Sequence, residues 1–136
     1  MLEAKRGYIY EFDDGKRDEN RYVLVVSSND RARDNRVSIL MLGDSDVGHD
    51  VVRIKCDGMA NKPVRYVHCA MITYTNREYL VKEVCKLPNE KMEKIDKIIC
   101  REFGLLEDLM FTANFYKNAY NELVDRLVNK EIDDGK

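Results

Sequence analysis

Short runs of apolar residues, some continuous and some alternating with polar ones, fill the first two thirds of the chain. The clearest run covers residues 22–26, which begin directly after Arg21 and stop at the polar sequence Ser-Ser-Asn-Asp. A continuous apolar run of this length between polar residues is typical of a buried strand. Weaker strand patterns lie at residues 6–12, 37–42, 51–56, 64–75 and 79–87. The pattern therefore predicts about six short strands.

The period of the apolar positions changes to a helical one after Pro88. Met92, Ile95, Ile98, Ile99 and Phe103 form one stripe, and Gly104 is placed to end the helix. A second helical pattern begins at residue 105 or 106 and continues through residue 127, and the residues from 130 onward form a polar tail. Many short strands followed by terminal helices predict a mainly β fold, a small and strongly curved β-barrel with C-terminal helices.

Composition and charge limit the possible functions. The formal net charge of −2 provides no global basic field, so nucleic-acid binding would depend on a local cluster of Lys and Arg. Cysteines stand at positions 56, 69, 85 and 100 without a Cys-x-x-Cys spacing, so no metal site is predicted. No secretory signal and no apolar run of membrane-spanning length are present. The protein is predicted to be cytoplasmic, with reduced thiols.

Arg21 is the first candidate for chemistry, because it stands where the buried strand begins. A guanidinium group offers planar donors that bind two oxygens of a phosphate at once. The alternative interpretation is an arginine in a surface ion pair. His49 and His68 are far apart in the sequence and are interpreted as loop or strand residues, since proton transfer needs a partner within hydrogen-bond reach.

Five segments follow one another in an order that is specific as a set, although no single segment is. They are Lys-Arg-Gly-Tyr-Ile-Tyr at 5–10, the stretch 21–30, the strand at 37–42, Val-His-Cys-Ala-Met-Ile-Thr at 67–73, and residues 86–96 ahead of Phe-Gly-Leu at 103–105. Over roughly residues 4 to 105, the chain resembles the MazF/PemK (Kid) toxin family. The resemblance implies an SH3-like or CcdB-like barrel domain over residues 1–105, followed by an additional C-terminal helix and polar tail over residues 106–136.

The resemblance also implies a function. Members of this family are typically metal-independent endoribonucleases that need no cofactor, form homodimers and are silenced by a cognate antitoxin. They cut single-stranded RNA, often messenger RNA, by attack of the ribose 2′-hydroxyl on its own phosphate, a reaction that depends on positioning and electrostatics. Arg21 matches the catalytic arginine of the family. The residues expected to bind the RNA are Arg17, Glu19, Asn29, Arg31, Arg33 and Thr73.

The chain departs from the family pattern at two positions. Gly43 stands where the family has a catalytic threonine, and Thr73 stands where the family has an arginine. Ser45 is the expected substitute for the missing hydroxyl, whereas Asp44 offers a base but would repel phosphate. The departures keep two alternatives open. One is a catalytically degenerate module that binds nucleic acid or protein, and the other is a CcdB-like protein that acts on a topoisomerase without binding RNA.

Overall fold

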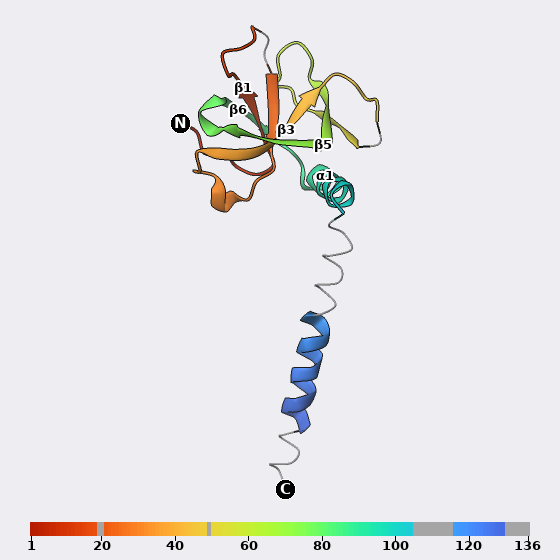
Figure 1. Cartoon of the computed structure of the whole chain (residues 1–136). Helices are drawn as coiled ribbons and strands as arrows, with labels where there is room; N and C mark the ends of the chain where they lie inside the picture. The colour runs from red at the N-terminus through yellow and green to blue at the C-terminus, as the bar shows by residue number, and fades with distance from the viewer. Residues whose placement is uncertain (19–20, 49, 105–115, 130–136) are drawn as a thin grey trace. The chain divides into compact units, whose positions relative to one another are not determined.

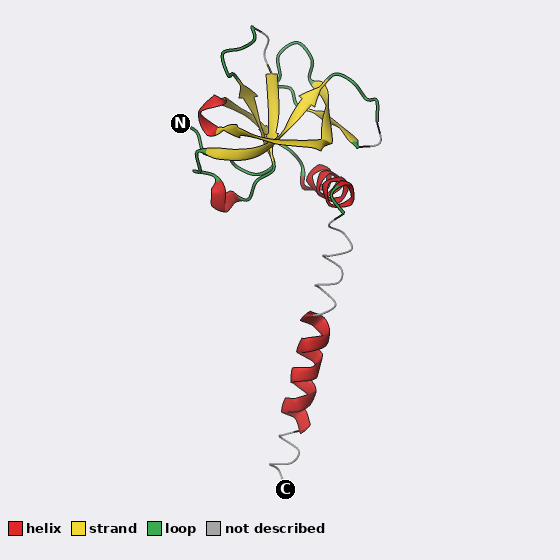
Figure 2. Cartoon of the chain, in the orientation of Figure 1, coloured by secondary structure: helices red, strands yellow, loops and turns green. Residues whose placement is uncertain are grey.

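A six-stranded antiparallel sheet forms the body of the protein in the computed structural model, which describes residues 1–18, 21–48, 50–104 and 116–129 (Figures 1 and 2). The strands are β1 (Tyr8–Phe12), β2 (Arg21–Val25), β3 (Arg36–Gly43), β4 (Val51–Lys55), β5 (Val64–Asn76) and β6 (Leu80–Lys86). Two 3-10 turns, η1 (Asn29–Arg31) and η2 (Arg77–Tyr79), lie in the connections, and the helix α1 (Asn89–Glu102) follows β6. The prediction of a mainly β fold with C-terminal helices is confirmed.

The sheet curves but does not close into a barrel. Its strand order is β4-β5-β3-β2-β1-β6, so β4 and β6 are the edge strands. A disulfide between Cys56, which follows β4, and Cys85 in β6 connects the two edges. The prediction of reduced thiols is therefore wrong for this pair, because the curvature of the sheet brings together two cysteines that are 29 residues apart in the sequence. Cys69 and Cys100 are free.

Side chains on the two faces of the sheet belong to two hydrophobic clusters. Successive residues of a strand point to opposite faces, so Tyr22 and Leu24 join the cluster that contains Ile95 of α1, and Val23 and Val25 join the other. The side chains of residues 22–25 are at most 3% exposed. Burial on both faces explains why this strand is continuously apolar rather than alternating.

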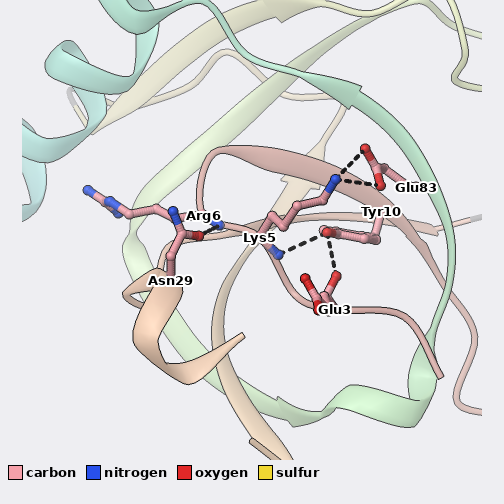
Figure 3. A network of polar contacts seen from close by, with 6 residues as sticks. All are labelled: Glu3, Lys5, Arg6, Tyr10, Asn29 and Glu83. Atoms are coloured by element: carbon pink, nitrogen blue, oxygen red, sulfur yellow. Dashed lines mark hydrogen bonds and ion pairs between the residues drawn. The ribbon is translucent and has the colours of Figure 1, made fainter. Parts of the chain in front are cut away.

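The N-terminal segment is fastened to the sheet by a polar network around Tyr10 (Figure 3). The Tyr10 hydroxyl donates a hydrogen bond to the carbonyl oxygen of Glu3 at 2.7 Å and accepts one from the Lys5 N–H at 2.9 Å. Lys5 also forms an ion pair with Glu83 on β6, with Nζ 3.1 Å from the carboxylate. Burial raises the pKa of the Tyr10 hydroxyl, which keeps the group neutral and able to make both hydrogen bonds.

The C-terminal part of the chain begins where α1 ends. Gly104 adopts a φ of +67° and donates its N–H to the Arg101 carbonyl at 3.2 Å, which confirms it as the residue that ends the helix. Phe103, the last member of the predicted stripe, is 51% exposed. Residues 116–129 form a further helix, while the predicted helical residues 105–115 lie outside the described ranges. No helix within the described part of the chain is long and apolar enough to span a membrane.

Candidate functional site

Arg21 opens β2 and is held there by two neighbours from β1 and the loop after it. Its guanidinium carbon lies 4.7 Å from the centroid of the Phe12 ring, within the range of a cation–π interaction. Nη2 forms an ion pair with the carboxylate of Asp14. The Arg21 and Asp14 side chains are only 16% and 14% exposed. Arg21 therefore takes part in an ion pair, as one sequence interpretation proposed, but the pair is mostly covered by protein rather than spread on the surface.

Asp14 carries a negative charge at neutral pH. Partial burial acts to raise its pKa, but hydrogen bonds from the Lys16 N–H, at 3.0 Å, and from Arg21 outweigh that effect and hold the pKa below its ordinary value. Asp14 therefore neutralises Arg21 and competes with any incoming anion. The Nε atom of Arg21 is buried and has no hydrogen-bond partner among the described residues.

Gly43 is the last residue of β3, the strand that pairs with β2 on the side away from β1. Val23 of β2 pairs with Met41 of β3, two residues before Gly43. A Cβ atom at Gly43 would lie 3.1 Å from Nε2 and 3.3 Å from Cδ2 of His68. The imidazole of His68 thus lies directly beside the position where a side chain at residue 43 would begin.

Sequence reasoning did not select Asp14, Phe12 or His68. Asp14 and Phe12 follow one another closely at the end of β1, and no pattern in the sequence indicates that they contact Arg21. His68 was interpreted as a loop or strand residue, and it lies in β5. The one available indication of its position was the glycine at residue 43, which leaves a gap in a strand of otherwise bulky residues.

Ser45 and Asp44 lie in the loop that follows β3. Ser45 is exposed, and its Oγ accepts a hydrogen bond from the Val47 N–H at 3.2 Å. The Asp44 carboxylate lies 3.5 Å from Nζ of Lys62 and 3.8 Å from Nη1 of Arg65. Asp44 is thus engaged by two cations, and catalysis by Ser45 stays a prediction.

Three of the predicted RNA-binding residues lie at the opposite end of β2 from Arg21, in and just after η1. The side-chain oxygen of Asn29 accepts the Arg6 N–H at 2.8 Å (Figure 3). Arg31 pairs with Asp34 at 3.1 Å, and Arg33 pairs with Glu3 at 2.8 Å. The structure does not bring these three residues together with Arg21, because the length of β2 separates them.

The remaining predicted residues lie in other parts of the fold. Arg17 is exposed in the loop between β1 and β2, which also contains Asp14, and Glu19 lies outside the described residues. Thr73 is exposed on β5, where it pairs with Ile39 of β3. Within the described ranges, no group of three or more His, Cys, Asp or Glu side chains gathers in a way that would hold a metal ion.

Comparisons with known proteins agree with this fold. An endoribonuclease from a mycobacterial species, solved with its cognate antitoxin, is 23% identical with a TM-score of 0.62 over 77% of this chain and 97% of its own. Mycobacterium tuberculosis toxin MazF-mt6 is 19% identical with a TM-score of 0.60, over 72% of this chain and 97% of its own. MazF from Deinococcus radiodurans is 11% identical with a TM-score of 0.61, over 76% and 99%. These likenesses show the fold.

The family assignment comes from the sequence itself. Comparison with curated proteins finds no significant match. Residues 5–103, which include all six strands and α1, match the family described as PemK-like, MazF-like toxins of type II toxin–antitoxin systems. The chain belongs to this PemK-like, MazF-like toxin family.

Proposed function

We propose that this protein is an endoribonuclease that cleaves single-stranded RNA by attack of a ribose 2′-hydroxyl on the adjacent phosphate, without a metal ion. The observation that carries the proposal is Arg21, which opens β2 within a chain of this toxin family and lies over Phe12. A guanidinium fixed in this way could stabilise the negative charge that develops on the phosphate during the attack. The reaction requires no covalent intermediate with the protein.

The proposed partners follow from the family. A type II toxin is expected to bind a cognate antitoxin, and one of the structural neighbours is an endoribonuclease solved in such a complex. We further propose that the protein acts in the cytoplasm as a homodimer. RNA would be the substrate, and the predicted contacts at Arg17, Glu19, Asn29, Arg31, Arg33 and Thr73 belong to this proposal.

The test measures cleavage of a mixed-sequence single-stranded RNA by the purified protein in the presence of a chelator. Wild type is expected to cleave, and Arg21→Ala to lose about 100-fold or more in rate, as when one transition-state stabilising group is removed. Arg21→Lys keeps the charge but loses the planar fork, so it is expected to recover only part of the rate. Arg101→Ala, an exposed arginine on α1, is the matched control and should cleave like wild type.

The products and the folding of the variants complete this experiment. Attack by the 2′-hydroxyl leaves a cyclic phosphate on one fragment and a 5′-hydroxyl on the other, whereas attack by water leaves a linear phosphate. Removing Arg21 leaves the mostly covered Asp14 carboxylate unpaired, so thermal denaturation of each variant must accompany the rates. No cleavage by wild type at high enzyme concentration would reject the proposal.

A second candidate function is a binding module without catalysis. Two observations favour it: Gly43 provides no hydroxyl, and the charge of Arg21 is neutralised by Asp14. This alternative predicts a gel shift of the RNA without cleavage in the same reactions. An Arg21→Ala variant would then weaken the shift, and the RNA would stay intact.

A further inference from the structure

The sheet face that carries Arg21 also carries His68. Tyr22, Leu42 and Val67 belong to the cluster around α1, so the residues next to them, Arg21, Gly43 and His68, point to the opposite face. The strands of these three residues are adjacent in the order β5-β3-β2. Tyr66 is the residue of β5 directly opposite Gly43, and His68 lies two residues further along β5 with its ring beside Gly43.

Gly43 makes this arrangement possible. Nε2 of His68 would lie 3.1 Å from a Cβ at residue 43, which is closer than most side-chain contacts allow. A larger residue at this position would push the imidazole away. Gly43 lacks the hydroxyl of the family threonine, and its missing side chain leaves room for the His68 imidazole.

The His68 imidazole is not fixed by a polar contact with any described residue. Its side chain is half-buried, and neither ring nitrogen has a hydrogen-bond or ion-pair partner in the described part of the chain. Val51 of β4 is the residue paired with His68. The preceding residue, Asp50, uses its carboxylate to accept a hydrogen bond from the Ala70 N–H at 3.2 Å. The histidine therefore has no structural hydrogen bond that would explain its presence.

The proposed reaction needs a group that accepts a proton near neutral pH. An arginine stays protonated, Asp14 is bound to Arg21 with a lowered pKa, and Asp44 lies between two cations. Histidine is the side chain that most often serves as a general acid or base in enzymes. Among these groups, His68 fits the task best.

We propose that His68 is the proton acceptor of the RNA cleavage reaction, an inference that rests on the proposed endoribonuclease function. The imidazole takes the proton of the 2′-hydroxyl as the 2′-oxygen forms a bond to phosphorus. The bond from phosphorus to the 5′-oxygen breaks, and the 5′-oxygen takes a proton from water. The resulting imidazolium returns its proton to solvent, so that no net oxidation or reduction occurs. Arg21, on the strand that flanks β3 on its other side, binds the phosphate.

The test compares wild type, His68→Ala and His68→Gln in single-turnover cleavage, with RNA binding measured separately. Both variants are expected to lose about 100-fold or more in the cleavage step while RNA affinity changes less than about threefold. Added imidazole should restore cleavage by His68→Ala in proportion to its concentration, because the truncated side chain leaves a space beside Gly43. Imidazole should not restore cleavage by Arg21→Ala. His68→Gln retains a polar side chain of similar size and guards against loss of folding in His68→Ala.

Each outcome decides the question. Cleavage by His68→Ala and His68→Gln within twofold of wild type would overturn the assignment and leave the endoribonuclease function intact. A lost rate that imidazole does not restore, in a variant that melts like wild type, would show that His68 only positions the site and would also overturn it. No cleavage by wild type would reject both this inference and the proposed function.

Discussion

At the scale of single residues, the state of Arg21 is the central physical question. A guanidinium that lies over a phenyl ring and against a carboxylate is well ordered, which reduces the entropy lost when it binds a phosphate. The same carboxylate opposes phosphate by charge repulsion. Asp14 therefore has two opposite effects on phosphate binding. It favours binding by ordering the Arg21 side chain and opposes it by its negative charge.

We predict that Asp14→Asn strengthens RNA binding. The amide oxygen can still accept a hydrogen bond from Arg21, but the negative charge is gone, so the site repels phosphate less. The expected change is about two- to fivefold in RNA affinity, the size of a single charge interaction near a protein surface. Binding is measured by fluorescence anisotropy on a labelled RNA at low and high salt. The gain should shrink at high salt, and Asp125→Asn, in the helix at residues 116–129, should show no gain.

We also predict that the effect of Asp14 on RNA affinity depends on pH. The pKa of Asp14 is lowered in the folded state, so its contribution to stability is present above the ordinary pKa and is lost as the pH falls through the folded value. Wild-type RNA affinity should therefore approach that of Asp14→Asn in acid. An unchanged ratio between the two proteins down to the lowest pH at which both stay folded would contradict this account of Asp14.

The position of Arg21 at the strand start was predictable from sequence, but its environment was not. The polar residue before a continuous apolar run is visible in the sequence pattern alone. The contact with Asp14 depends on how the loop after β1 folds back, and charged turn residues occur in many loops without such a role. The proposed role of His68 was not predictable for a similar reason, because it depends on the space that Gly43 leaves beside the ring.

At the scale of elements, the strands were predictable because their apolar pattern reflects burial. Each of the six predicted strand segments overlaps an observed strand, with ends that differ by a few residues. The register was not predictable. The pairing of β3 with β5 shifts between Leu40 and Leu42, which interrupts the alternation of β5 and sets Tyr66 opposite Gly43. His68 lies within the stretch of β5 that this irregularity spans.

The alternation of apolar and polar residues along the strands also does not show that the edge strands β4 and β6 come close together. The disulfide Cys56–Cys85 joins the end of β4 to β6, and a Cβ at Gly58 would lie 2.7 Å from a methyl carbon of Val84. The turn after β4 therefore packs tightly against β6. β4 and β6 are not paired with each other in the sheet, so the disulfide and this packing connect its two edges.

We predict that reduction of this disulfide lowers the free energy of unfolding by about 2–4 kcal/mol, because the cross-link restricts the unfolded chain. Urea denaturation with and without a phosphine reductant measures the change. The double variant Cys56→Ser with Cys85→Ser is the control and should not respond to the reductant. Burial and the nearby Asp50 and Asp96 raise the pKa of the Cys69 thiol to about 12, so this buried cysteine should not exchange with the disulfide. Equal urea midpoints in both conditions would contradict the prediction.

At the scale of the whole molecule, the family match covers the sheet and α1, and the chain continues beyond it. The family match ends at residue 103, and the structural neighbours are covered almost completely while about a quarter of this chain has no counterpart in them. The helix at residues 116–129 exposes Tyr116, Tyr120, Leu123 and Leu127 at spacings of three and four residues. The separation into a domain of residues 1–105 and an additional helix stays a prediction.

The oligomeric state of the full and truncated chains tests whether a dimer interface lies on the sheet or on the C-terminal helix. The sheet exposes large apolar side chains on β5 and β6, with Met71 62%, Tyr74 66% and Val81 51% exposed, and two-fold dimers are the commonest way to cover such surfaces. If the sheet forms the dimer, as the family resemblance implies, residues 105–136 are not needed for it. We predict that both the full chain and a chain ending at Gly104 scatter light as dimers at micromolar concentration, the full chain at twice 15.9 kDa. A monomeric full chain would reject the dimer, and a dimer lost only on truncation would assign the interface to the C-terminal helix.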